Sequence, residues 1–360
     1  MSSNRATLKK VADALGLSVN TVSRALAGKD AVKESTRQLI EKTAADMGYV
    51  PNSMARSLVL GKAMTIGLVI TNPSNPFYAR LISAVEEQCR NHGYSLLLFA
   101  TEENPDNERS AVQTLYRWGV DGAIVVPSQQ SVESWELLKR YDIPMVLINR
   151  YLDGFDCDFV GVDYEQGAYE ATKALLQSDT QRRVYLLEED LEISTVRSRI
   201  SGYVRAMTEA GQGPERHFVE RVPTTRLDSS TLPWDPAAAY RAANDLMDKF
   251  TPGSAILVGN DYFALGLYKA LTEAGLRIPE DIEVFGYGNH PFSAYMQPPL
   301  STMALPAEAI GSAAVALLIQ RIDETASTEE AAHIVKSAEM IIRDSTRPRQ
   351  NAAATSGVVW

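Results

Sequence analysis

The sequence predicts a small all-α helix-turn-helix head with a hinge helix, followed by an α/β body of two lobes, each built on a doubly wound parallel sheet. Three observations carry this prediction. Residues 1–62 contain ten Lys or Arg against five Asp or Glu, whereas the whole 360-residue chain has a net charge of −10. Two short helical patterns stand close together near the start. Beyond residue 62, apolar runs alternate with helix-like segments in two series.

The head, residues 1–48, has the spacing of a helix-turn-helix. Apolar residues recur at positions 8, 11, 12 and 15, with Thr7 in a capping position before them and Gly16 directly after them. Ser18 then caps a second helix after a turn of about three residues. A third helix over residues 34–47 is expected to complete a minimal core with apolar residues that include Leu39 and Ile40.

The second helix, within "SVNTVSRALAGK", has one apolar side and one bare side. Val22 and Ala25 fall on one side, and Asn20, Ser23 and Arg24 on the other. Asn can pair with adenine and Arg with guanine in the major groove, and an exposed Val19 could touch a thymine methyl group. The alternative is an ordinary solvated surface helix. The basic head and the two-helix spacing favour DNA recognition.

A hinge and linker, residues 49–62, join head and body through "GYVPNSMARSLVLGK". Pro51 suits the first turn of a helix, but about two turns of free helix are marginal in water and need support. Such a conditional helix could lie in the minor groove and wedge Leu58 between base steps. A passive linker is the alternative. The candidate DNA contacts of head and hinge are Thr7, Val19, Asn20, Thr21, Ser23, Arg24, Asn52, Arg56 and Leu58.

The body, residues 63–345, contains eight apolar runs in two series of four, separated near residues 159–168. The runs are "MTIGLVI", "YSLLLFA", "DGAIVV", "PMVLIN", "RRVYLLE", "HFVERVP", "SAILVG" and "DIEVFG". We expect the chain to cross between the lobes near residues 161–164, 289–293 and 322–326. Residues 346–360 show no helical period or heptads and are expected to form a loose tail.

These motifs resemble the lactose and galactose repressor (LacI/GalR) family of bacterial transcription regulators. The resemblance runs from about Thr7 to Arg343 and includes "TLKKVADALGLSVNTVSRALAG", "GYVPNSMARSLVLGK" and "GNDYFALGLYKALTEAGLRIPEDIEVFGY". It implies a homodimer on a near-palindromic operator, a hinge helix that orders on DNA, and Leu58 intercalated at the centre. One departure is Lys33, which replaces the usual cap of the third helix and would let that helix fray. The body alone would equally fit periplasmic-binding-protein-like sugar carriers, which have no basic head.

Polar and aromatic residues follow the predicted strands, where ligands bind to parallel sheets. Together with the resemblance, these positions imply an effector pocket between the lobes. Phe77 and Trp234 would stack on the ligand, although aromatic residues are more often core than ligand platforms. The candidate effector contacts are Asn75, Phe77, Tyr78, Ser128, Asn149, Arg150, Arg199, Trp234, Asn260 and Asn289.

Two departures bear on the effector. Asn149 and Gly288 stand where many sugar-binding relatives have Asp. Arg150 and Arg199 would then lack two balancing carboxylates, so the cleft is expected to be positive and its effector anionic, such as a sugar acid or sugar phosphate. A neutral sugar is the alternative, with Asp163 or Asp261 as the compensating acid.

Other function classes find little support. There is no GxxxxGK[ST] loop, no GxSxG elbow and no complete dinucleotide fingerprint, so we expect no enzyme and no cofactor. The four His are scattered, and the two Cys form no CxxC pair, which predicts no metal site. No run approaches a membrane span and the start lacks a secretory pattern, so a cytoplasmic protein that contacts no membrane is expected. The sequence leaves open whether the effector is an inducer or a corepressor.

Overall fold

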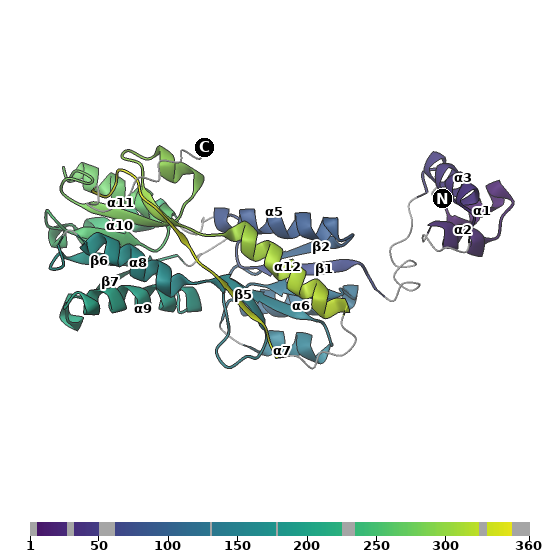
Figure 1. Ribbon diagram of the computed structural model, residues 1–360, viewed down its shortest axis with the longest axis horizontal. Coiled ribbons are helices and arrows are strands. Elements are labelled where there is room, and N and C mark those ends of the chain that lie inside the picture. The colour runs from purple at the N-terminus through teal and green to yellow at the C-terminus, as the bar shows by residue number, and fades with distance from the viewer. Residues whose placement is uncertain are drawn as a thin grey trace. The chain divides into compact units, whose positions relative to one another are not determined.

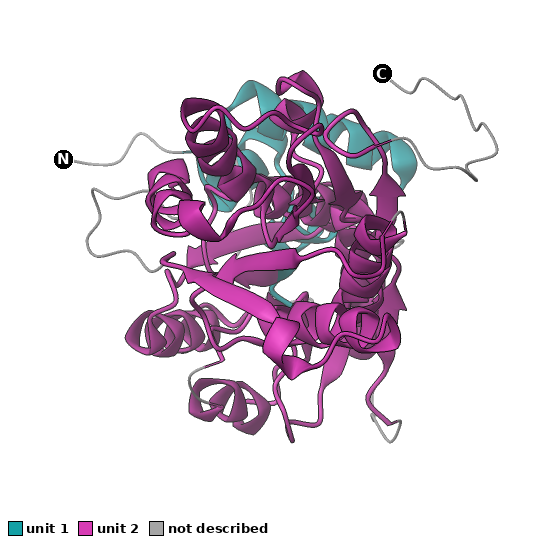
Figure 2. Cartoon of the chain, turned by 90° about the vertical axis from the view of Figure 1, so that its left-hand side faces the viewer, with its two compact units in different colours: residues 1–65 teal, residues 66–360 magenta. Residues whose placement is uncertain are grey.

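The computed structural model describes residues 6–26, 32–49, 62–129, 132–177, 179–224, 235–323 and 330–347. The chain separates into two compact units, Met1–Thr65 and Ile66–Trp360 (Figure 2). Among the described residues, no helix has the length and apolar character needed to cross a membrane. The first unit contains the predicted head and hinge, and the second contains nearly all of the predicted body.

The head is a bundle of three helices: α1 Leu8–Leu15, α2 Val19–Leu26 and α3 Glu34–Asp46. Gly16 ends α1 in the left-handed conformation, with φ 62°. The Ser18 hydroxyl accepts from the Thr21 backbone N–H at 3.0 Å and so caps α2. Lys33, at the N-cap of α3, makes no side-chain capping bond.

The head core is small. Its buried members are Val11, Ala12, Val22, Ala25, Ile40 and Ala44. Leu39, which was expected in this core, is 53% exposed. The prediction was wrong because α3 turns Ile40 and Ala44, four residues apart, toward the other helices, and Tyr49 packs against the cluster.

The first lobe is a six-stranded sheet in the order β11-β5-β4-β3-β1-β2. Its strands are β1 Thr65–Ile70, β2 Ser95–Ala100, β3 Gly122–Val125, β4 Met145–Ile148, β5 Asp158–Val162 and β11 His333–Lys336. Its helices are α5 Pro76–Asn91, α6 Pro105–Trp118, α7 Glu133–Arg140 and α12 Ala307–Asp323. Helices α5 and α12 lie side by side (Figure 1), and Gly311 brings α12 close to Leu81 and Ala84 of α5.

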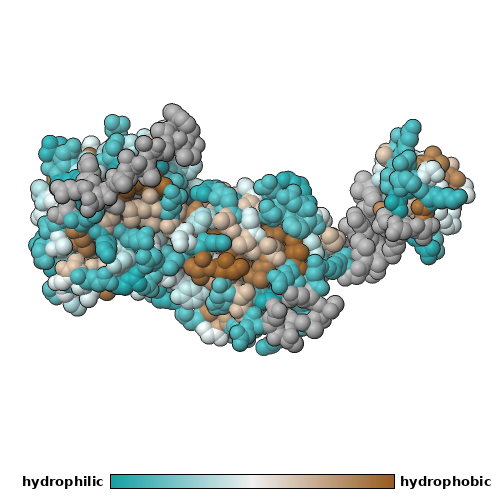
Figure 3. Space-filling model, in the orientation of Figure 1, coloured by the Kyte–Doolittle hydropathy of each residue, from teal (hydrophilic) through white to brown (hydrophobic). Residues whose placement is uncertain are grey.

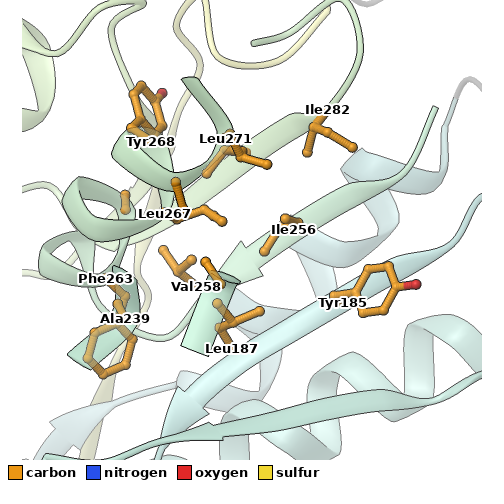
Figure 4. Packing of buried hydrophobic residues seen from close by; sticks show 14 of the residues in the cluster. Tyr185, Leu187, Ala239, Ile256, Val258, Phe263, Leu267, Tyr268, Leu271 and Ile282 are labelled. Carbon is orange, nitrogen blue, oxygen red and sulfur yellow. The ribbon is translucent and has the colours of Figure 1, made fainter. Parts of the chain in front are cut away.

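The second lobe repeats this plan with the order β12-β10-β9-β8-β6-β7. Its strands are β6 Val184–Glu189, β7 Phe218–Val222, β8 Ala255–Val258, β9 Glu283–Gly288, β10 Ser301–Ala304 and β12 Glu339–Ile341. Its longer helices are α8 Tyr164–Leu176, α9 Ser194–Glu209, α10 Pro236–Asp245 and α11 Asp261–Glu273. Figure 4 shows Ile256 and Val258 of β8 packed against Leu267 and Leu271 of α11. All eight predicted apolar runs form strands in the expected lobes.

The chain crosses between the lobes at residue 163, at residues 305–306 and at residues 337–338. The crossings expected near residues 289–293 and 322–326 were wrong. After β9 the chain first adds β10 in parallel to the same sheet, so it leaves the second lobe only at Leu305. After α12 it first adds β11 in parallel to β5 in the first sheet.

The body extends past its expected end at residue 345. Thr346 is buried, and its hydroxyl lies 2.8 Å from that of Ser301 in β10. The Arg347 guanidinium donates to the backbone oxygen of Glu280 at 2.8 Å. The expected tail therefore began two residues too early, because these polar side chains find partners on the second sheet. Residues 348–360 lie outside the described residues.

Candidate functional site

One side of α2 is exposed. Val19 is 43% exposed, and Asn20 and Arg24 are also exposed, whereas Val22 and Ala25 are buried in the head core. The helix therefore presents a hydrogen-bonding amide, a guanidinium group and an apolar side chain on the side away from its core. These three groups match the edges of adenine, guanine and thymine in the major groove.

Two other predicted DNA contacts have capping roles. The Thr7 hydroxyl accepts from the Lys10 backbone N–H at 3.3 Å, and the Thr21 hydroxyl lies 2.8 Å from that of Ser18. Both side chains thus hold the helix ends in place, and each keeps some exposure. Ser23 is partly exposed beside them. The hinge candidates Asn52, Arg56 and Leu58 lie outside the described residues.

A cavity lies where the two lobes meet. Its volume is about 40 Å³, small beside the roughly 300–1,000 Å³ of typical small-molecule pockets. Seven predicted effector residues line it: Asn75, Phe77, Tyr78, Asn149, Arg150, Arg199 and Asn260. The strand ends of both sheets therefore converge on one place, as the sequence predicts.

Two predicted residues, Ser128 and Asn289, do not line the cavity. Ser128 is buried behind it, where its backbone N–H donates to Glu108 at 2.6 Å. The Asn289 side chain accepts from Arg343 at 2.8 Å and so points into the second lobe. Both are corrections to the expected site: the Ser128 backbone N–H and the Asn289 side chain have their partners within their own lobes. Trp234 lies outside the described residues.

The sequence reasoning missed several lining residues. They are Tyr164, Glu189, Thr195, Gly259, Tyr287, Gly288, His290 and Leu305. Glu189 ends β6, so the strand-end rule could have found it. Tyr164 and Leu305 lie at crossings between the lobes. The crossing at Leu305 was expected near residues 289–293, so this residue was not considered.

Two asparagines occupy matching positions in the two lobes. The Asn75 side chain caps α5 by accepting from the Phe77 N–H at 2.9 Å, and the Asn260 side chain caps α11 by accepting from the Tyr262 N–H at 3.0 Å. Each amide oxygen is thus fixed by a helix N-terminus. Both residues line the cavity.

Asn149 is held between two tyrosines. The Tyr164 hydroxyl donates to its side-chain oxygen at 2.6 Å, and its side-chain nitrogen donates to the Tyr78 hydroxyl at 3.4 Å. Its backbone is left-handed, with φ 66°, a conformation that Asn tolerates better than most residues. Burial raises the pKa of both tyrosines, so they remain neutral donors and acceptors.

Arg150 makes a two-pronged ion pair with Glu103. Its two terminal nitrogens donate to the carboxylate at 2.9 and 2.8 Å, and one also donates to the backbone oxygen of Pro127 at 3.2 Å. Burial alone would lower the pKa of Arg150, but Glu103 raises it above its ordinary value. The guanidinium group is therefore charged and already compensated.

Arg199 is compensated in the same way by Glu188. Two nitrogens donate to this buried carboxylate at 2.7 Å each, and Glu189 lies 3.9 Å away. The guanidinium carbon is also 5.4 and 5.5 Å from the ring centres of Tyr164 and Tyr287, within cation–π range. Burial opposes the charge, yet the acids keep the pKa of Arg199 above its usual value.

The expected positive cleft is therefore wrong. Neither proposed acid balances the arginines, because Asp163 caps α8, and Asp261 accepts from the His290 backbone N–H and the Ser293 hydroxyl. Glu103 and Glu188 do so instead.

Among the described residues there is also no group of three or more His, Cys, Asp or Glu able to hold a metal ion.

Comparison with known proteins places this architecture. Residues 7–52 match the family described as bacterial regulatory proteins, lacI family, and residues 63–343 match periplasmic binding proteins and sugar binding domain of LacI family. The chain belongs to the LacI family. This LacI-family chain is a transcriptional repressor with a DNA-binding head and a ligand-binding body.

Relatives span nearly the whole LacI-family chain. The HTH-type transcriptional repressor PurR of Pasteurella multocida is 32% identical over 96% of this chain and 99% of its own length. PurR of Photobacterium profundum is 32% identical over 95% of this chain and 99% of its own. Repression is thus the activity named for these relatives.

Solved structures show the same fold. A lac repressor dimer bound to operator and the anti-inducer ONPF is 23% identical, with a TM-score of 0.83, covering 95% of this chain and 99% of that one. A LacI family regulator from Enterococcus faecium with bound ribose is 26% identical, with a TM-score of 0.67, covering 79% and 100%. A CelR–cellobiose complex is 24% identical, with a TM-score of 0.69, covering 95% and 100%.

Proposed function

We propose that this repressor binds a near-palindromic operator as a homodimer, and that a neutral, hydroxyl-rich small molecule in the cavity between the lobes controls its affinity for DNA. The exposed side of α2 carries the DNA part of the proposal. Asn20 and Arg24 stand on that side with Val19, supported from behind by the buried Val22. Operator DNA is a cytoplasmic target in bacteria, so we also propose a cytoplasmic location.

Exposed apolar residues on the body support the homodimer. Leu98, on the edge strand β2, is 46% exposed, and Trp118, at the end of α6, is 66% exposed. Figure 3 shows further apolar residues gathered over α12 of the same lobe. Apolar surface of this kind marks protein contacts, and the similar lac repressor is a dimer on its operator. Two α2 helices would then read two half-sites.

The neutral effector follows from the charges around the cavity. Each arginine already has both hydrogen-bonding prongs on a glutamate, at 2.7 to 2.9 Å. An anionic effector would add a negative charge beside two carboxylates that already balance the arginines, and burying a charge without its own counter-charge is costly. A neutral sugar needs hydrogen-bond partners for its hydroxyl groups and an apolar surface to stack on. Asn75 and Asn260 supply the first, and Phe77 supplies the second.

The small cavity supports induction. The cavity of about 40 Å³ is small for a ligand pocket, so we propose that entry of a sugar widens the space between the lobes. A ligand shifts a two-state equilibrium toward the state that it fits better. We therefore propose that the effector favours a state in which the paired heads lose their spacing on DNA. A corepressor would instead favour the DNA-bound state.

Arg24→Ala tests the DNA-reading role. DNA fragments retained by the purified protein are sequenced from a random pool, and affinities for the selected site are then measured. We expect Arg24→Ala to weaken binding by about 1–3 kcal/mol and to relax preference at one base pair in each half-site. Lys42→Ala, an exposed cation on α3, is the control and should weaken all sequences alike. A wild-type protein that retains no preferred sequence would refute the proposal.

A further inference from the structure

One feature of the cavity wall is unusual at the end of β9. Gly288 has φ 134°, a conformation that side chains rarely adopt. A Cβ at this position would lie 3.1 Å from Cε1 and 3.3 Å from Nε2 of His290. The imidazole ring thus fills the space that a side chain at 288 would take. The missing side chain brings His290 to the cavity wall.

The ring of His290 is fixed by its own lobe. Its backbone N–H donates to the buried Asp261 at 2.9 Å, and its ring centre lies 5.4 Å from that of Tyr262 and 5.7 Å from that of Phe292. The residue is only 3% exposed. These contacts place the imidazole on the second-lobe side of the cavity.

One nitrogen of this ring lacks a partner. Nε2 is buried and makes no hydrogen bond with any residue that the structure describes. Burial lowers the pKa of His290; Arg80 acts in the same direction and Asp261 opposes it. The neutral imidazole has one donor and one acceptor nitrogen. Leaving such a buried polar atom unpaired costs free energy unless something else binds it.

We propose that His290 is a specificity-determining residue of the effector pocket, whose Nε2 hydrogen-bonds a hydroxyl or amide group of a neutral effector. This inference rests on the proposed effector site. The buried Nε2 without a partner, the place of the ring on the cavity wall and its packing over Gly288 all point to the same contact. His290 would then select for a polar group at one position of the ligand, while the charges of both arginines are balanced by glutamates.

Three variants separate ligand contact from structural support. His290→Phe keeps a ring but removes both nitrogens, and His290→Gln keeps a donor and an acceptor. His92→Gln, an exposed histidine that follows α5, is the matched control. Without ligand, we expect the Tm of His290→Phe to be unchanged or raised, because the substitution removes an unpaired polar atom. A fall of more than about 5 °C would show a structural partner for Nε2 and overturn the inference.

Binding is then measured by thermal shift and calorimetry with D-ribose, D-glucose and cellobiose as neutral probes, and with D-gluconate and glucose 6-phosphate as anions. We expect a neutral probe to bind the wild type, about tenfold weaker binding by His290→Phe, and affinities near that of the wild type for His290→Gln and His92→Gln. Equal binding by wild type and His290→Phe would overturn the role of His290 but leave the proposed effector class standing. Binding of the anions alone, or of no probe, would overturn both. Operator selection, measured separately, tests the head.

Discussion

The two lobes put the same charged groups around the cavity but secure them differently. The first lobe has Arg150 with Glu103 and Glu108, and the second has Arg199 with Glu188 and Glu189. The Glu103 side chain is 20% exposed and its backbone is left-handed, whereas the Glu188 side chain is wholly buried at the end of a strand. The first lobe can therefore hydrate its acid if the pair breaks, but the second cannot.

This difference shows how the pocket sets its own charge. Two arginines face four glutamates, so the groups around the cavity do not require an anion for balance. In the second lobe, Arg199 is also the cation that stands against two tyrosines and two acids. We expect the stability of the second lobe to depend on its arginine more strongly than that of the first. The following variants compare the two arginines.

The largest effect is expected for Arg199→Met. The variant leaves Glu188 buried without its cation, which costs about 3–5 kcal/mol of the free energy of unfolding. Urea unfolding followed by circular dichroism measures it. Arg197→Met on the same helix is the control: its partner Asp153 has a side chain 72% exposed, so a loss below about 1 kcal/mol is expected.

A double variant, Arg199→Met with Glu188→Leu, sharpens the test. Replacing a buried ion pair with apolar side chains is often neutral or stabilising, so most of the lost stability should return. If Arg199→Met unfolds at the same urea midpoint as the wild type, the second lobe does not depend on its arginine as we expect.

The sequence predicts the fold well where apolar runs are long and less well where strands are short. All eight predicted runs form β1–β4 and β6–β9. Strands β10, β11 and β12 read "STMA", "HIVK" and "EMI", which are too short and too mixed to stand out from loops. Because these strands decide when the chain changes lobes, two of the crossings were misplaced.

In the pocket, the residues at the strand ends could be predicted from the sequence, but their ion-pair partners could not. Asn75, Asn149 and Asn260 follow apolar runs, so the general rule for parallel sheets finds them. Glu103 is 47 residues from Arg150 along the chain, and only the folded loop brings the two together. The prediction of a positive cleft failed because the sequence shows which acids are missing but not which others replace them.

A smaller effect is expected for Arg150→Met. The Glu103 carboxylate can turn toward water when its partner is lost, so we expect a cost of about 1–3 kcal/mol in the free energy of unfolding. The same urea experiment measures it. A loss as large as that of Arg199→Met would show that the exposure of Glu103 does not protect the first lobe, and the contrast between the lobes would disappear.

The smallest effect concerns Glu108, the second acid of the first lobe. Burial raises its pKa to about 6, from an ordinary value of 4.5. One oxygen accepts from the Ser128 N–H at 2.6 Å, and the other, Oε2, has no hydrogen-bond partner among the described residues. A protonated Glu108 carboxyl suits this site, because the Ser128 backbone N–H needs only one acceptor oxygen.

Glu108→Gln therefore gives a pH-dependent difference in stability. Since the folded-state pKa is raised, the contribution of Glu108 is fully present below pH 4.5 and is lost as the pH rises through about 6. Gln keeps the acceptor for Ser128 and never ionises. We expect the variant to match the wild type near pH 4 and to exceed it by about 1–2 kcal/mol near pH 8, in thermal unfolding scans. Glu87→Gln, exposed on α5, controls for the substitution itself. A Glu108→Gln variant that is less stable than the wild type at pH 8 would mean that the ionised carboxylate stabilises the lobe by pairing with Arg150.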